Sequence, residues 1–158
     1  PVPLAELTPE RWRATVDLNL TSAFLTLRAF LPGMAARGRG SVVTVSSLAG
    51  QHVVAQARVS ASPAYAAAKA GLLMLTRQAA REYAPSGVRV NAVSPGSVEN
   101  ARIRSMPPEA RRGLEGSHPL GRIGVPDDVA AAALYLLGDA AAWVTGATLD
   151  VNGGFAML

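Results

Sequence analysis

The sequence contains no cysteine and only two histidines, and aromatic residues make up just 5% of its 158 residues. Without cysteine there can be no disulfide bond and no thiol chemistry, which fits a reducing, cytoplasmic location. The two histidines, His52 and His118, lie far apart without ligand-like spacing, so we expect no metal site. No apolar run reaches membrane-spanning length, so we expect no membrane association.

Lysine is almost absent too, because Lys69 is the only lysine among the 15 basic residues. The net charge of +4 comes from dispersed arginines, and Pro107, Pro108 and Glu109 interrupt the densest basic stretch, residues 102–112. A nucleic-acid groove needs a basic stripe interleaved with aromatic residues. We therefore expect no nucleic-acid partner.

Helix and strand patterns alternate along the chain. The predicted elements are, in order, a long amphipathic helix over 9–36, a strand over 41–47, a helix over 63–83, a strand over 87–95, a short helix over 108–114, a helix over 125–138 and a strand over 146–154. Leaving the short helix aside, the order α-β-α-β-α-β predicts an α/β fold with a parallel sheet and right-handed crossovers. No repeat or linker divides residues 1–158, so we expect a single domain.

Polar residues follow the first two predicted strands. Ser46 and Ser47 end the first strand, and Ser94, Pro95 and Gly96 end the second. Ligands of such sheets bind at the carboxyl ends of the strands, and the helix over 63–83 begins on that same side. We therefore expect a site at this edge.

Tyr65 and Lys69 lie one helical turn apart on one face of the helix over 63–83. A free phenol exchanges protons poorly at neutral pH, and a nearby ammonium group stabilises the phenolate, which makes tyrosine a usable acid–base group. Taken alone, the pattern favours the ordinary interpretation, with Tyr65 as an amphipathic helix residue and Lys69 as a solvated surface charge.

Several ordered motifs, covering almost the whole chain, resemble the short-chain dehydrogenase/reductase family. They are VDLNLTSAF (16–24), SVVTVSS (41–47), YAAAKAG (65–71), VRVNAVSPG (88–96), PLGRIGVPDDVAAAALYLLGD (119–139) and WVTGATLDVNGG (143–154). The resemblance implies a Rossmann-like doubly wound parallel sheet, of which this chain is the C-terminal part.

The resemblance also implies a role for each residue of the site. Tyr65 would be the general acid in carbonyl reduction and the base in alcohol oxidation. Lys69 would stabilise the phenolate and hydrogen-bond to the ribose of a nicotinamide cofactor. Ser47 would hold and polarise the substrate oxygen, whereas Ser46 would be a structural residue. Asn19 would anchor a water molecule that links Lys69 to solvent.

The cofactor implied by the family is NAD or NADP. Pro95, Gly96 and Val98 would hold the nicotinamide through backbone contacts, although Gly96 also suits an ordinary turn. Asn100 stands where the family usually has a threonine that contacts the carboxamide. The implied substrate is a carbonyl or secondary alcohol, with 3-oxoacyl-carrier-protein reductase, polyol or sugar dehydrogenase and steroid dehydrogenase activities all open.

The chain departs from the family in two further respects. It has no Gly-rich dinucleotide-binding turn, so we expect a fragment of a longer enzyme that lacks the N-terminal half. The segment between Ser47 and Tyr65 is longer than in the compact ketoacyl reductases and should border the substrate pocket. His52 and Arg58, which it contains, are expected to be solvated loop residues, with contact to a polar substrate as the alternative.

The family resemblance further implies a homodimer or homotetramer formed through the helices over 9–36 and 63–84. A competing hypothesis from a different class is a non-catalytic truncated remnant of the family that acts only through self-association.

Overall fold

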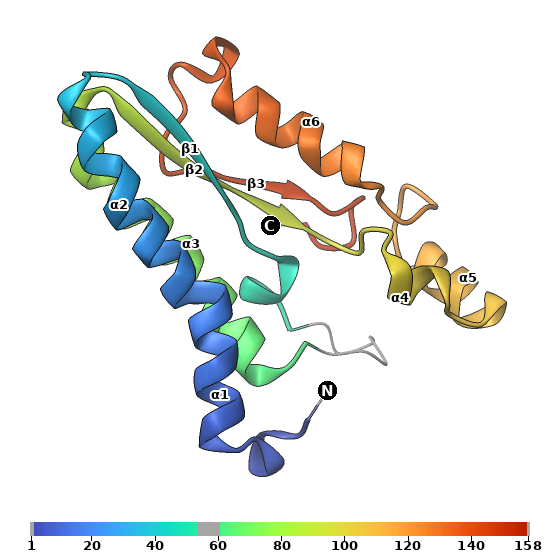
Figure 1. Ribbon diagram of the computed structural model, residues 1–158. Coiled ribbons are helices and arrows are strands. Elements are labelled where there is room, and N and C mark those ends of the chain that lie inside the picture. The colour runs from blue at the N-terminus through green and yellow to red at the C-terminus, as the bar shows by residue number, and fades with distance from the viewer. Residues whose placement is uncertain (1, 54–60, 158) are drawn as a thin grey trace.

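A parallel sheet forms the centre of the structure, a computed structural model that describes residues 2–53 and 61–157 (Figure 1). Within those residues the sheet has three strands in the order β1-β2-β3, namely β1 (Gly40–Val45), β2 (Val88–Pro95) and β3 (Thr148–Val151). Both strand pairs are parallel, with Val42 opposite Val90 and Ser94 opposite Asp150. The predicted α/β fold with a parallel sheet is confirmed.

Helices cover both faces of the sheet (Figure 1). One face packs against α2 (Ser22–Ala36) and α3 (Pro63–Tyr83), and the other packs against α6 (Pro126–Leu137). The central strand β2 is therefore enclosed from both sides, and Val88, Val90, Ala92 and Val93 are at most 1% exposed. This burial explains why the strand carries apolar side chains at these four positions.

The core between the sheet and the first helical layer is built from small and branched apolar side chains. Its buried members are Leu27 and Leu31 of α2, Ala79 and Ala80 of α3, and Val88 and Val90 of β2. Each buried leucine contributes about 1.5–3 kcal/mol relative to exposure. The alanines let the backbone of α3 approach the sheet closely. Gly87 then turns the chain into β2 with φ of +72°, a conformation that glycine adopts without strain.

The predicted helix over 9–36 has the right limits and is helical throughout, but it is not α-helical along its whole length. It consists of α1 (Pro9–Val16), a π-helical turn η2 (Asp17–Thr21) and α2. Within it, the Asn19 side chain donates to the carbonyl of Thr15 at 2.9 Å, and Ser22 Oγ donates to the carbonyl of Leu18 at 2.7 Å. Side-chain groups that compete for helix carbonyls bend helices. An apolar three- and four-residue spacing does not show such competition, so the change of helix type was not predicted.

The remaining elements are short. They are η1 (Leu4–Glu6), η3 (Leu48–Gly50), η4 (Ala84–Ser86), α4 (Ala101–Arg104), α5 (Pro108–Gly116) and η5 (Asp139–Ala141). The short helix predicted over 108–114 corresponds to α5, whereas α4 was missed. In the described part of the chain, no helix has the length and apolar character that crossing a membrane requires.

Candidate active site

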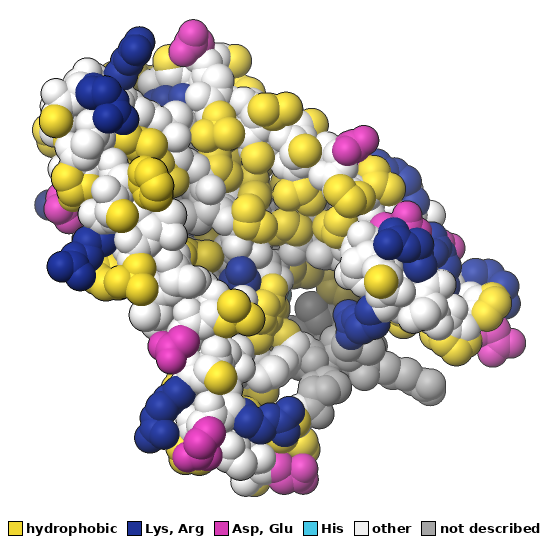
Figure 2. Space-filling view, viewed as in Figure 1, with side chains coloured by type: hydrophobic (Ala, Val, Ile, Leu, Met, Phe, Trp, Pro, Cys, Tyr) yellow, Lys and Arg dark blue, Asp and Glu magenta, His cyan; other side chains and the backbone are white. Residues whose placement is uncertain are grey.

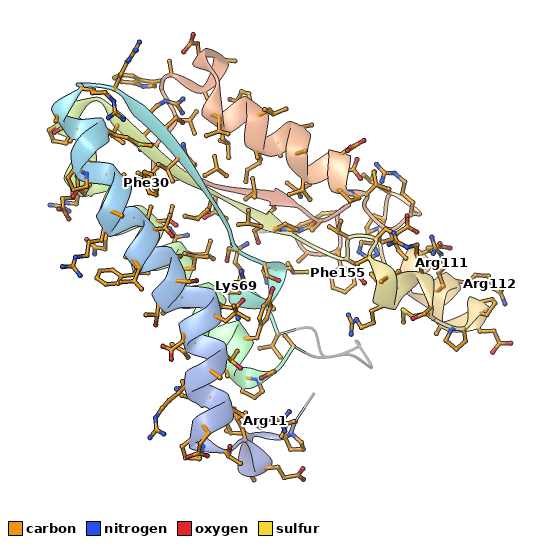
Figure 3. All side chains as sticks on the ribbon, viewed as in Figure 1. Arg11, Phe30, Lys69, Arg111, Arg112 and Phe155 are labelled. Atoms are coloured by element: carbon orange, nitrogen blue, oxygen red, sulfur yellow. The ribbon has the colours of Figure 1, made fainter. Side chains whose placement is uncertain are left out.

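The C-terminal end of β1 is fastened to α3 at Lys69. The Lys69 ammonium group donates to the carbonyl of Val45 at 2.9 Å, and Ser46 Oγ donates to the carbonyl of Lys69 at 3.0 Å. Ser46 is only 3% exposed, and its backbone N–H extends the ladder by donating to Val93. Figure 3 shows Lys69 where α3 passes this end of the sheet. Sequence reasoning did not foresee that Lys69 would bind the end of the strand.

Tyr65 lies one turn before Lys69 on α3 and is half-buried. The Lys69 Nζ atom is 5.5 Å from the centre of the Tyr65 ring, so an ammonium charge lies beside the phenol. Partial burial lowers the pKa of Lys69 from its ordinary value. Within the described residues, the Lys69 ammonium group uses one of its three protons in the hydrogen bond to the Val45 carbonyl. The Tyr65 hydroxyl has no hydrogen-bond partner among these residues.

Ser47 begins the turn that leaves β1. Its Oγ accepts a hydrogen bond from the backbone N–H of Ala49 at 3.2 Å and so caps η3. Because the hydroxyl accepts this bond, its own proton remains available for a substrate oxygen. The turn lies directly against α3, since a Cβ atom on Gly50 would come within 2.7 Å of the Lys69 carbonyl carbon. Ser47, Tyr65 and Lys69 therefore belong to one region, at the carboxyl ends of the strands.

Asn19 lies in the π-helical turn η2, which packs against α3. The two elements pack tightly at Gly71, because a Cβ atom there would lie 2.9 Å from Leu20 Cδ2. Single π-helical turns occur frequently at functional sites. The Asn19 amide itself donates to Thr15, so its role in proton relay stays a prediction.

The segment after β2 is held in place from two sides. The Gly96 N–H donates to the carbonyl of Val151 at 3.0 Å, and Val98 pairs with Gly124 in a parallel bridge. A Cβ atom on Gly96 would lie 3.0 Å from the Cα atom of Asn152. Close backbone packing therefore gives Gly96 a structural role, beside the predicted cofactor contact of Pro95, Gly96 and Val98.

Asn100 caps a helix. Its Oδ1 accepts from the N–H of Ile103 at 3.0 Å, and its Nδ2 donates to the carbonyl of Val98 at 3.1 Å. Asparagine is among the preferred residues at this position of a helix. The structure thus supplies a local reason for Asn100, and its predicted contact with a carboxamide stays a prediction.

Two predictions concern the segment between β1 and α3. Arg58 lies outside the described residues. The Nε2 atom of His52 is buried and has no hydrogen-bond partner among the described residues, which differs from the solvated side chain that we expected. Sequence reasoning also missed Gln51, whose amide Nε2 donates to Ser94 Oγ at 2.7 Å and to Asp150 Oδ1 at 2.6 Å. No local pattern could have found this contact, because residues 43 and 99 positions away supply the acceptors.

A parallel α/β sheet with a serine after one strand and a tyrosine and lysine one helical turn apart defines the class of protein. The chain belongs to the short-chain dehydrogenase/reductase family: a family model described as enoyl-(acyl carrier protein) reductase matches residues 1–156. It is 42% identical over 153 residues to cis-4-hydroxycyclohexanecarboxylate dehydrogenase of Sinomonas cyclohexanicum, a match that covers 97% of this chain and 59% of that protein.

Solved structures agree in fold. A 3-oxoacyl-(acyl-carrier protein) reductase from Brucella melitensis superposes with a TM-score of 0.90 at 37% identity, covering 98% of this chain and 56% of that one. A second reductase of this name from Brucella melitensis, solved with bound NAD, gives a TM-score of 0.85 at 38% identity and covers 98% and 55%. The chain thus spans less than two thirds of the length of these proteins.

Proposed function

We propose that this chain carries the acid–base part of an NAD(P)-dependent oxidoreductase that interconverts a carbonyl and a secondary alcohol. The observation that carries the proposal is the position of Tyr65 and Lys69, one turn apart on α3, beside the turn that Ser47 caps. In a family of this kind, such groups at the carboxyl ends of parallel strands support catalysis.

In the direction of reduction, the Tyr65 hydroxyl would donate its proton to the carbonyl oxygen of the substrate as that oxygen gains negative charge. The Ser47 hydroxyl would donate a hydrogen bond to the same oxygen, because its acceptor side is already used by Ala49. The neighbouring Lys69 ammonium group would stabilise the phenolate that remains. In oxidation Tyr65 would take the proton back. The nicotinamide cofactor would donate or accept the hydride.

The donor groups of the site fit such a cofactor. In the region that the structure describes, the Tyr65 hydroxyl is unpaired and Lys69 uses one ammonium proton. An ammonium and a phenol suit the two hydroxyl groups of a ribose. Tyr65 and Lys69 would therefore hold the ribose, and the backbone of Pro95, Gly96 and Val98, with Asn100, would hold the nicotinamide of NAD or NADP.

We further propose that the part of the relatives that this chain does not match supplies the Gly-rich dinucleotide cradle. Within the described residues β1 pairs with β2 alone, so its other edge has no strand neighbour. Hydrophobic side chains gather between α2 and α6 beside that edge (Figure 2). They line a groove of about 350 Å³, with Phe30, Val45 and Leu137 on its walls. A further parallel strand at this edge would pair the open strand and bury the groove.

The substrate and the assembly also belong to this proposal. The relatives point to a 3-oxoacyl thioester or a cyclic alcohol, and polyol, sugar and steroid substrates remain alternatives. A homodimer or homotetramer would form through α1, η2, α2 and α3, whose outer surfaces expose large apolar side chains. These are Trp12, Leu18, Phe24, Leu25 and Met74. We also propose that the protein is cytoplasmic.

The test is Tyr65→Phe in the intact protein that contains this chain. The variant removes only the phenolic oxygen, so turnover should fall by about 10²–10⁴-fold. Nicotinamide-cofactor affinity should fall by no more than about tenfold, because only one ribose hydrogen bond is lost. Tyr135→Phe on the exposed face of α6 is the matched control and should leave both unchanged. Activity is measured by cofactor absorbance and binding by fluorescence titration.

Two outcomes would count against the proposal. Turnover by Tyr65→Phe close to that of wild type would remove Tyr65 as the proton donor. An intact protein that binds no nicotinamide cofactor would favour the non-catalytic alternative, in which the fold is kept only for self-association.

A further inference from the structure

Gln51 links three parts of the site that are distant in sequence. It follows η3 directly, and its backbone N–H donates to the carbonyl of Leu48 at 2.9 Å, so its position is fixed relative to the turn that Ser47 caps. Its side chain leaves that turn and reaches the ends of two strands. The amide Nε2 is 2.7 Å from Ser94 Oγ on β2 and 2.6 Å from Asp150 Oδ1 on β3.

The two acceptors form a matched pair. Ser94 and Asp150 are directly opposite each other in the parallel register, and Ser94 is 0% exposed. A primary amide nitrogen has two protons, one for each acceptor. The carboxylate of Asp150 requires the donor end of the amide to face it, because the amide oxygen in its place would bring two acceptors together. This fixes the orientation of the Gln51 side chain.

Asp150 depends on this contact. Among the described residues, no lysine, arginine or histidine forms an ion pair with its half-buried carboxylate, and Gln51 is its only side-chain donor. Hydrogen bonds to a charged group are roughly twice as strong as neutral ones. The contact therefore holds the Ser47 turn firmly against the sheet.

The end of β2 continues into the segment that is proposed to hold the nicotinamide, and the end of β3 is hydrogen-bonded to that segment. Ser94 precedes Pro95 and Gly96, and the Gly96 N–H donates to the carbonyl of Val151, the residue after Asp150. One amide thus joins the turn that presents the substrate-binding hydroxyl to the loop expected to hold the nicotinamide. We propose that Gln51 is a positioning residue, which fixes Ser47 relative to the Pro95–Gly96 loop through Ser94 and Asp150. The inference rests on the proposed function.

The test exchanges the amide of Gln51 and the carboxylate of Asp150, first singly and then together, in the intact enzyme. Gln51→Glu places a second carboxylate against Asp150, and the repulsion should displace the turn and lower kcat/KM for the substrate by about 10–100-fold. Asp150→Asn keeps an acceptor for Gln51 and should change kcat/KM by less than about threefold. The double variant Q51E/D150N restores one donor and one carboxylate, now exchanged, and should recover to within about threefold of wild type.

The matched control is Q51E/D127N, which has the same net charge but alters an exposed carboxylate in the first turn of α6. It should remain as impaired as Gln51→Glu alone. The cofactor dissociation constant and the urea midpoint are measured for every variant, at a temperature where all are folded. A positioning role predicts a loss in kcat/KM for the substrate that is larger than any loss in cofactor affinity, and a merely structural role predicts no such difference.

Three results would overturn the inference: unchanged kcat/KM in Gln51→Glu, recovery in Q51E/D127N equal to that in Q51E/D150N, or a loss of kcat/KM in Gln51→Glu no larger than its loss of cofactor affinity. A wild-type enzyme without turnover would instead refute the proposed function. Even then, the urea midpoints of the four variants would show whether Gln51 and Asp150 interact, and an additive pair would refute the contact itself.

Discussion

Gly50 offers the sharpest test of how the site is assembled, because the turn after β1 touches the backbone of α3 at this residue. A Cβ atom there would lie 2.7 Å from the carbonyl carbon of Lys69 and 2.8 Å from the nitrogen of Ala70. Both distances are several tenths of an ångström inside normal contact, and backbone atoms of a helix cannot rotate away. In Gly50→Ala, either η3 or α3 must therefore move.

The expected effect follows from the contacts that such a movement disturbs. Overpacking of this kind costs about 1–3 kcal/mol, and loss of the hydrogen bond from Ser46 Oγ to the Lys69 carbonyl would add about 1 kcal/mol. Gly50→Ala should therefore lower the free energy of unfolding by about 2–4 kcal/mol. Turnover should fall as well, because Ser47 and Tyr65 are displaced relative to each other.

The assay is urea unfolding followed by circular dichroism, with the slope checked for constancy. Gly113→Ala is the control: it lies in α5, a Cβ atom there meets nothing within 4 Å, and the substitution should stabilise by about 0.5–1 kcal/mol. If Gly50→Ala changes the unfolding free energy by less than about 0.5 kcal/mol, the turn is not held rigidly against α3 and the reasoning is refuted.

Two further predictions concern charge and assembly. Arg122 forms two hydrogen bonds to Asp128, at 2.7 and 2.8 Å, and holds the pKa of that carboxyl well below its ordinary value. This stabilisation is complete above a pH of about 4 and is lost as pH falls toward the lower folded-state pKa. Between pH 4 and pH 2 the Tm of wild type should therefore fall more steeply than that of Asp128→Asn, and parallel curves would contradict this assignment. Leu18 and Leu25, 75% and 52% exposed, lie one heptad apart on the outer surface of η2 and α2. Leu25→Glu should shift the intact protein toward monomer in sedimentation velocity, and an unchanged sedimentation coefficient would argue against an interface at this surface.

Much of the fold could be predicted because its elements have local signatures. The start of α3 at Pro63 and its end at Tyr83 match the prediction, since proline suits the first turn of a helix and Pro85 and Gly87 prevent its continuation. The β-branched run of β1 and the alternating apolar residues of β2 likewise fix their own extents to within two residues. In each case the residues that determine the structure lie inside the element.

The site was predicted less completely, because its contacts cross between elements. The positions of Tyr65 and Lys69 on one helix face followed from helix geometry, whereas the bond from Lys69 to Val45 depends on how α3 packs on the sheet. The Gln51 amide depends on a strand register that no single segment encodes. The π-helical turn at Asn19 coincides with a side-chain hydrogen bond from Asn19 to the carbonyl of Thr15, which an apolar period does not show.

The two adjacent serines after β1 have different roles, one in holding the structure together and the other in the proposed reaction. Ser46 binds the backbone carbonyl of Lys69, so it anchors α3 whatever side chain residue 69 has, while the proton of Ser47 is left for the substrate. Substitutions at Ser47, or at the side chain of Lys69, can therefore alter reactivity while this anchor of α3 remains. Substitutions in such a protein can change the substrate that it accepts, or abolish its activity, while the fold is retained.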